Sequence, residues 1–321
     1  WLGITPDEWW VSGGPCAPYV QSERLDMYQK AAHVLIERRM AYRCFCTEER
    51  LAEMRAQQQA QGAPSGYDRT CRNMPSDRRR ELESAGTPYT VRLAVPLEGT
   101  TSYSDLVYGD VTFDNRTVDD QVLLKSNGWP TYHLAVVDHA MGITHVIRGE
   151  DWMPSTPKQV LIYQALGWEQ PIWVHIPLTL GPDRKKLSKR HGATQFTDFI
   201  RQGYLPEAMF NFLVLLGWSP GEDAQEVMSV TEILERFDLS GIGRNPAVFD
   251  YDKLRWMNGE HIRRCDHARL ADLCVPFLHE AGLVEDPPTQ DERGRLKRVV
   301  PLMIERLHLL SDAPALMAPF F

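Results

Sequence analysis

A dense run of positive charge between residues 183 and 193 is the segment of this sequence best suited to chemistry. Five Lys and Arg side chains fall within the seven residues 184–190, directly after Gly181-Pro182 and an apolar stretch. Like charges this close repel one another unless an anion is present, and loops that leave the strands of a parallel sheet commonly bind phosphates. The run therefore predicts a triphosphate site that stabilises charge on a leaving pyrophosphate. The alternative is a solvated basic loop.

The cysteines divide into a spaced group and isolated residues. Cys44 and Cys46 form a C-x-C pair and Cys71 follows later in the chain, whereas the other three cysteines stand alone. Six cysteines in 321 residues are too few for a disulfide scaffold. Reduced thiols together with a metal clip are typical of a cytoplasmic protein, so we expect a cytoplasmic location.

The overall composition limits the class of protein. The chain has 321 residues, a net charge of −8 and 43 % hydrophobic residues, which is typical of a globular protein with more than one domain. The acidic balance excludes binding of nucleic acid through bulk charge and leaves only local basic patches. No apolar stretch is long enough for a membrane span. The sequence begins at Trp1 without a signal peptide, and we expect it to be the middle of a longer protein.

The first part of the chain predicts a mixture of helices and strands. We expect a helix over 22–40 with Ser22 as its N-cap, a strand over 41–46, and a second helix capped by Thr47. The segment from there to residue 80 is polar and predicts irregular structure. Alternation with a period of two then predicts the following strands: 89–95, 107–113 and 121–125.

Strands and a crossover helix follow. We expect strands over 131–138, 144–148 and 173–178, and a helix that begins at 155–157 and ends at Gly167. A strand–helix–strand order predicts a parallel sheet with ligands at the carboxyl ends of its strands. The remainder predicts the following helices: 206–216, 246–264, 268–281 and 293–310. The expected fold class is α/β, with a parallel sheet, a mixed α/β insertion and an all-helical C-terminal region.

Several motifs together resemble one family. Residues 186–190, KLSKR, resemble the K-[ML]-S-K-[SR] loop of class I aminoacyl-tRNA synthetases, in the form typical of glutamyl-tRNA synthetases. The other matching stretches are 21–25, 128–134, 145–152, 155–159, 246–250 and 254–259. They occur in family order over nearly the whole chain, so the resemblance is specific.

The resemblance implies roles for individual residues. Lys189, assisted by Lys186, would contact the ATP phosphates as the catalytic lysines. Arg148 would pair with a carboxylate of glutamate, which suits a planar guanidinium, and Tyr132 would bind the same substrate through its hydroxyl. The remaining residues of the ATP site would be Glu150, Trp152, Leu178 and Ser188. The alternative for Arg148 is a structural ion pair with Glu150 or Asp151, and that for Tyr132 is a core tyrosine on a strand.

The cysteine group resembles the zinc arm of many members of the family. Structural zinc needs four ligands, mostly thiolates. Cys44, Cys46 and Cys71 supply three of them, and Asn73 occupies the position where the family often has a histidine. Tyr67 occupies a ligand position used in a close paralogue and is the expected fourth ligand. The alternative is a degenerate arm without metal.

The resemblance also implies a domain plan and a reaction. The expected segments are 1–40 and 129–193 (two Rossmann halves), 41–128 (an insertion that contacts the tRNA acceptor end), 194–260 (a stem-contact domain) and 261–321 (the start of an anticodon-binding domain). Glutamate would attack the α-phosphate of ATP with Mg²⁺ bridging the phosphates, and a ribose hydroxyl of tRNA(Glu) would then attack the adenylate. We expect a monomer.

The family pattern is incomplete in this sequence. The H-I-G-H-type element and most of an anticodon-binding domain are absent, so we expect a fragment that cannot form the adenylate alone. Alternatives are a non-catalytic tRNA-binding relative, a glutaminyl enzyme and a tRNA-modifying paralogue. The sequence at 148–151 and Leu187 argue against the glutaminyl enzyme, and the stretch from Pro246 onward argues against the paralogue. An unrelated P-loop nucleotidase is disfavoured because no G-x-x-x-x-G-K-[ST] motif is present.

Overall fold

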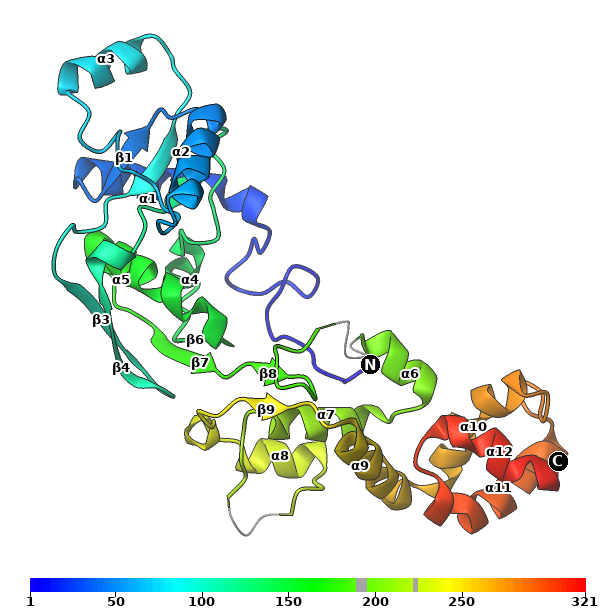
Figure 1. Cartoon of the computed structure of the whole chain (residues 1–321). Coiled ribbons are helices and arrows are strands. Elements are labelled where there is room, and N and C mark those ends of the chain that lie inside the picture. Colours follow the sequence, from blue (N-terminus) through cyan, green and yellow to red (C-terminus); the bar gives the residue numbers. More distant parts are fainter. Residues whose placement is uncertain (189–194, 222–224) are drawn as a thin grey trace. The chain divides into compact units, whose positions relative to one another are not determined.

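The computed structural model describes residues 1–188, 195–221 and 225–321, so Lys189 lies outside the described residues. The chain divides into two compact units. We call Pro6–His175 the sheet unit, and we call Trp1–Thr5 together with Ile176–Phe321 the helical unit. Figure 1 labels the elements of both units, and each unit is described by itself. This division is coarser than the five segments expected from the sequence.

Two sheets organise the sheet unit. The four-stranded sheet has the order β4-β3-β7-β6, and β3 pairs with β7 in parallel through Asp105 and Trp173. Its strands are β3 (Thr100–Asp105), β4 (Gly109–Asp114), β6 (His145–Gly149) and β7 (Ile172–Ile176). An antiparallel three-stranded sheet comprises β1 (Ala41–Cys44), β2 (Thr90–Leu93) and β5 (Val122–Leu124).

Helices α1 (Leu25–Glu37) and α5 (Thr156–Leu166) are packed against each other in the core of the sheet unit. The 3₁₀ helix Gln21–Arg24 precedes α1. Helix α5 begins with Pro157 in its first turn and ends at Gly167, whose φ of 74° is favoured by glycine. The sequence predicted both ends of α5, and the structure confirms them.

Helix α2 (Glu48–Ala60) begins as the sequence predicted. The Thr47 side chain accepts a hydrogen bond from the backbone N–H of Arg50 at 3.3 Å, which satisfies one of the free amides of the first turn. Ser22 is not a cap, because it lies inside the 3₁₀ helix that Val20 precedes. The polar segment before residue 80 is not irregular throughout, since α3 (Ser76–Ser84) forms there.

The strand expected over 131–138 is wrong. Thr131 donates to the Leu123 carbonyl, but the next amides bond locally, with Leu134 donating to Thr131 and Val136 to Leu134. Residues from Val136 then form the short helix α4 (Val136–Ala140). Val136 is buried from this helix, so the apolar residues that suggested a strand fill the core from helical backbone. Tyr132 therefore lies in a turn.

The helical unit contains one small sheet and a series of helices. Strands β8 (Thr179–Leu180) and β9 (Ala247–Val248) pair in parallel. The helices are α6 (Phe196–Gln202), α7 (Pro206–Leu215), α8 (Val230–Arg236), α9 (Tyr251–Arg264), α10 (His267–Glu280), α11 (Gln290–Met303) and α12 (Ala313–Met317). Helix α9 begins later than predicted because residues 247–248 extend into β9 and Asp250 caps the helix.

Helices α10, α11 and α12 gather near the C-terminus (Figure 1), and their buried residues share one core with residues of α7 and α9. The structure confirms the predicted α/β class, with a parallel strand pair in the sheet unit and a region after residue 194 that is helical apart from β9. Within the described residues, no helix has the length and apolar content that crossing a membrane requires.

Candidate functional site

Arg148 lies near the end of β6, as predicted, and its guanidinium is held by neutral groups. Its Nε donates to His175 Nε2 at 3.1 Å, and its Nη2 donates to Thr156 Oγ1 at 2.8 Å and to Gln159 Oε1 at 2.7 Å. Its Nη1 is buried and has no partner among the described residues. No carboxylate of a described residue forms an ion pair with this guanidinium, so Arg148 is not the structural ion pair considered from the sequence.

A cavity of about 410 Å³ lies beside this arginine. Its lining includes Arg148, Gln159, Tyr132 and Asp138. The pKa of Asp138 is raised by burial, and the positive charge of Arg148 opposes this shift only in part. The cavity therefore combines a cation with few competing anions, which suits a negatively charged group of a ligand.

Tyr132, which lines this cavity, forms an aromatic pair with Trp152. Their ring centroids are 4.5 Å apart, and Trp152 lies 5.9 Å from the guanidinium carbon of Arg148. Tyr132 is 58 % exposed, so it is not the buried core tyrosine considered as its alternative role. Both rings belong to the site residues expected from the sequence, and the structure brings them together with Arg148.

Glu150 lies next to this group in the 3₁₀ helix Glu150–Ser155. Its carboxylate accepts a hydrogen bond from the Tyr108 hydroxyl at 2.5 Å. Tyr108 comes from the turn between β3 and β4, so this contact joins that turn to the segment after β6. The Glu150 carboxylate therefore has a neutral hydrogen-bond donor in Tyr108 and, within the described residues, it forms no ion pair with Arg148.

The described part of the lysine-rich loop belongs to the helical unit. Gly181 donates to the Lys185 carbonyl at 2.7 Å and Leu187 to the Thr179 carbonyl at 2.9 Å, so the chain turns back onto β8 before the loop continues. Lys186 and Ser188 are exposed, and Leu178 is half-buried. Because Arg148 lies in the sheet unit, the proximity of the loop to Arg148 stays a prediction.

The predicted metal ligands converge on one point. The sulfur atoms of Cys44, Cys46 and Cys71 all lie within 4.8 Å of one another, and Tyr67 Oη lies 3.3 Å from the sulfur of Cys44 and 3.4 Å from that of Cys46. Tetrahedral zinc with Zn–S bonds of about 2.3 Å places its sulfurs about 3.8 Å apart. The donor set and its spacing fit structural zinc.

The electrostatics of this cluster favour a negative charge. The hydrogen bond between the Cys44 and Cys71 sulfurs lowers the pKa of Cys44 and raises that of Cys71, so the pair favours one thiolate and one thiol. The guanidinium of Arg92 lies 3.9 Å from the centre of the Tyr67 ring. Thiolates are the form of cysteine that binds zinc, so the cluster is prepared for a cation.

Two neighbouring aspartates hold the loop that carries Tyr67 and Cys71. Asp119 accepts from the Tyr67 backbone N–H at 2.9 Å. The buried carboxylate of Asp120 forms ion pairs with Arg69 and Arg72, both at 3.3 Å. These contacts fix the second half of the cysteine cluster to the three-stranded sheet.

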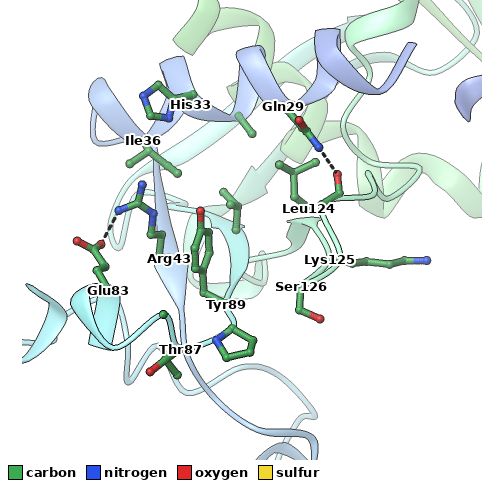
Figure 2. Close-up of a pocket in the computed structure, with 15 residues that line it drawn as sticks. Gln29, His33, Ile36, Arg43, Glu83, Thr87, Tyr89, Leu124, Lys125 and Ser126 are labelled. Carbon is green, nitrogen blue, oxygen red and sulfur yellow. Dashed lines mark hydrogen bonds and ion pairs between the residues drawn. The ribbon is translucent and has the colours of Figure 1, made fainter. Parts of the chain in front are cut away.

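A larger cavity of about 600 Å³ in the sheet unit contains none of the predicted site residues. Figure 2 shows Tyr89 in this cavity beside Arg43, whose guanidinium lies 5.0 Å from the Tyr89 ring and forms an ion pair with Glu83 at 2.5 Å. Lys125 points away from the cavity in the same view. Arg43 and Glu83, two charged residues of its lining, are therefore already paired with each other.

The sequence reasoning missed four residues of the Arg148 site. Thr156 and Gln159 lie within the motif 155–159 that carried the resemblance, but no role was assigned to them. His175 and Asp105 lie on β7 and β3, far from Arg148 in sequence, and no local pattern marks them. Only the parallel pairing of these two strands brings them together.

The comparisons with known proteins agree with this geometry. Residues 1–256 match the family described as tRNA synthetases class I (E and Q), catalytic domain. The chain therefore belongs to the class I tRNA synthetases of the glutamate and glutamine group. Within this group, its sequence is 45 % identical over 324 residues to the glutamate–tRNA ligase of Moorella thermoacetica and 44 % identical over 334 residues to that of Treponema denticola.

These relatives are longer than the chain. The chain is covered to 100 % and 97 % in the two alignments, but it spans only 66 % of the length of each relative. Among solved structures, it is similar to a glutamate tRNA ligase from Elizabethkingia meningosepticum in complex with its amino acid. The TM-score is 0.88 at 35 % identity, over 97 % of this chain and 66 % of that one.

Proposed function

We propose that this chain carries the amino-acid and nucleotide site of an enzyme that ligates L-glutamate to tRNA(Glu). The observation that carries the proposal is Arg148, a guanidinium held by three neutral acceptors beside a cavity, with one nitrogen left unpartnered among the described residues. A side-chain carboxylate of glutamate would complete its hydrogen bonds. The glutamate–tRNA ligases to which the chain is similar support the same substrate.

The proposed reaction has two steps. An oxygen of the glutamate α-carboxylate attacks the α-phosphorus of ATP, and the bond to the β-phosphate oxygen breaks to release pyrophosphate. A terminal ribose hydroxyl of the tRNA then attacks the carbonyl carbon of the adenylate, and AMP leaves. No side chain has to form a covalent intermediate, so the protein acts through position and charge.

The remaining site residues receive roles in the same proposal. Tyr132 would bind glutamate through its hydroxyl, and Trp152 with Glu150 would lie beside ATP. Lys186 and Lys189 would contact the phosphates. Ser188 and the backbone near Leu178 would complete the nucleotide site. Mg²⁺ bound to the phosphates would neutralise part of their charge.

We further propose structural zinc held by Cys44, Cys46, Cys71 and Tyr67 in the insertion 41–128, which would contact the tRNA acceptor end. Bound zinc would cross-link β1 to the loop around residue 71, and it would take no part in the ligation reaction. We also propose that residues 1–40 and 129–193 form two Rossmann halves, followed by the helical segments 194–260 and 261–321. The protein would be a monomer, and it would be located in the cytoplasm.

The test of function is glutamate-dependent exchange of pyrophosphate into ATP by the protein that contains this chain. Replacing Arg148 by Gln removes a charge-assisted hydrogen bond worth about 1.5–3 kcal/mol, so the KM for glutamate should rise about 10- to 150-fold. The KM for ATP should stay within about twofold. Glutamine should not support exchange by the unmodified protein.

The matched control is Arg116→Gln, because Arg116 is an exposed arginine paired with Asp114 on the surface. This variant should keep both KM values. Equal exchange with glutamine, or an R148Q variant that still uses glutamate normally, would contradict the proposed role of Arg148.

Metal analysis tests the zinc site without an activity assay. The purified chain should contain one zinc, and Cys71→Ser should lose it. Cys274→Ser is the matched control, since Cys274 is a buried cysteine of the helical unit, outside the cluster. A metal-free chain whose stability does not respond to added zinc would contradict this site.

A further inference from the structure

A buried polar chain leads from β3 through β7 to Arg148. Asp105 Oδ2 lies 2.6 Å from His175 Nδ1, and both side chains are completely buried. His175 Nε2 lies 3.1 Å from Arg148 Nε. Neither Asp105 nor His175 lines the 410 Å³ cavity beside Arg148. Their link to that cavity is Arg148.

The hydrogen bonds determine where the histidine carries its proton. An arginine nitrogen can only donate, so His175 Nε2 must accept and cannot carry hydrogen. The remaining proton must then lie on Nδ1, where it is donated to the Asp105 carboxylate. Burial lowers the pKa of His175, which favours the neutral ring; the Asp105 carboxylate opposes this shift and the charge of Arg148 supports it. One tautomer alone satisfies all three residues.

Asp105 is itself fixed by backbone. Its second oxygen, Oδ1, accepts from the amides of Val107 and Tyr108, each at 3.0 Å. The carboxylate therefore belongs to the tight turn between β3 and β4 and cannot rotate without breaking it. The turn, the histidine and the arginine form a rigid sequence of donors and acceptors.

This arrangement accounts for the hydrogens of the guanidinium. Arginine has five N–H groups, and His175, Thr156 and Gln159 occupy the one on Nε and the two on Nη2. The two on Nη1 are left for a ligand. A neutral His175 that accepts at Nε2 fixes the rotation of the Arg148 guanidinium. Nη1 is then the guanidinium nitrogen that is left for the ligand.

We propose that His175 and Asp105 are positioning residues, which hold Arg148 so that its Nη1 alone receives the substrate carboxylate. The proposal rests on the function proposed above and names two residues for which neither the family match nor the sequence provided a role. Asp105 acts by fixing the tautomer of His175, and His175 acts by presenting an acceptor to Arg148.

The first experiment observes the tautomer directly. Imidazole nitrogen shifts of His175, measured by NMR on the chain labelled with ¹⁵N-histidine and assigned with His175→Gln, should show a protonated Nδ1 and an unprotonated Nε2. The opposite tautomer, or an imidazolium at neutral pH, would overturn the proposal. This measurement needs no substrate, so it tests the tautomer of His175 even if the proposed function is wrong.

The second experiment reverses the tautomer with Asp105→Asn. The amide oxygen can still accept from Val107 and Tyr108, so the turn is kept, but the amide nitrogen then donates to His175 Nδ1. The histidine then carries its proton on Nε2, where it can no longer accept from Arg148 Nε and can donate only to Thr156 Oγ1, 3.2 Å away, among the contacts of the described residues. The nitrogen shifts of His175 should therefore exchange their character, and a purely structural Asp105 would not produce this.

Activity of the protein that contains this chain supplies the functional readout. Displacing a binding group by about 1 Å can lower the rate about 100-fold, so D105N should raise the KM for glutamate about 10- to 100-fold and leave the KM for ATP within about twofold. His175→Gln, whose amide oxygen can accept from Arg148, should recover part of the loss seen with His175→Phe.

Asp266→Asn is the matched control. Asp266 Oδ1 also accepts two backbone amides, at 3.0 and 2.9 Å, but it is exposed at the start of α10. Equal losses in D105N and D266N, or a D105N protein with the original tautomer and an unchanged KM for glutamate, would overturn the proposal. Normal glutamate use by R148Q would instead contradict the proposed function. The NMR measurement of the His175 tautomer would still test the contacts between Asp105, His175 and Arg148.

Discussion

At the scale of single residues, the partners of a buried charge determine whether it is available to a ligand or holds structure. Arg148 is surrounded by neutral acceptors, whereas Asp120 is surrounded by donors. Asp120 accepts from the Tyr42 hydroxyl at 2.7 Å and from the Val95 amide at 3.3 Å, in addition to its two arginines. An arginine without an ion-pair partner is suited to bind a ligand, and an aspartate with four donors is suited to hold structure.

Replacing Asp120 by Asn should strongly destabilise the sheet unit. The amide nitrogen would face donors that now bind a carboxylate, and breaking a buried ion pair typically costs about 3–5 kcal/mol. The free energy of unfolding, measured by urea denaturation, should fall by about 3 kcal/mol or more. Asp110→Asn, an exposed change on β4, should leave it within about 0.5 kcal/mol. Equal stability of the two variants would show that Asp120 does not hold the cysteine loop.

At the scale of elements, local signals predict where helices begin and end, but they do not identify every segment. The Thr47 cap and the Pro157 and Gly167 ends of α5 follow from rules that act within one helical turn. Residues 131–138 have the composition of a strand, but after Thr131, which bonds to Leu123 of β5, the amides of Leu134 and Val136 bond locally and α4 begins at Val136. Local composition does not report which hydrogen-bond partners the fold supplies.

Gly203, which ends α6, gives an element-scale prediction. Its φ is 80°, and an added Cβ would lie 2.7 Å from the backbone nitrogen of Leu310. Left-handed backbone costs about 1–2 kcal/mol for a residue with a side chain, and overpacking adds about 1–3 kcal/mol. Gly203→Ala should therefore lower the free energy of unfolding by about 3 kcal/mol, measured with urea.

Gly282 provides the comparison within the same unit. Its φ is 72°, but no atom lies within 4 Å of an added Cβ. Gly282→Ala should cost only the backbone strain of about 1 kcal/mol. If both alanine variants lost the same stability, the close packing of Leu310 against Gly203 would not contribute.

At the scale of the whole molecule, each compact unit contains a histidine whose pKa is lowered by its surroundings. Burial, together with the positive charges of Lys158 and Arg148, lowers the pKa of His133 in the sheet unit to about 4. Burial also lowers the pKa of His261 in the helical unit. The cost of charging these rings in the folded state makes stability depend on pH.

The sign of this dependence follows from proton binding. Unfolded histidine titrates near 6.5, and folded His133 near 4, so the unfolded state binds more protons between these values. The free energy of unfolding should fall as the pH is lowered from about 6.5 to about 4. Urea midpoints across this range should show a smaller fall for His133→Gln. An unchanged slope in that variant would mean that His133 is protonated in the folded protein.

The sequence by itself determined the family and the α/β class, and it pointed to the lysine-rich loop and to the three cysteines that the structure brings together. These features depend on residue types at short spacing, which are visible without a fold. The partners of Arg148 and the anchors of the cysteine loop were decided by tertiary structure alone. His175 meets Arg148, and Asp120 meets Arg69 and Arg72, only after strands distant in sequence have paired, because a side-chain hydrogen bond requires a distance of about 3 Å that no sequence spacing encodes.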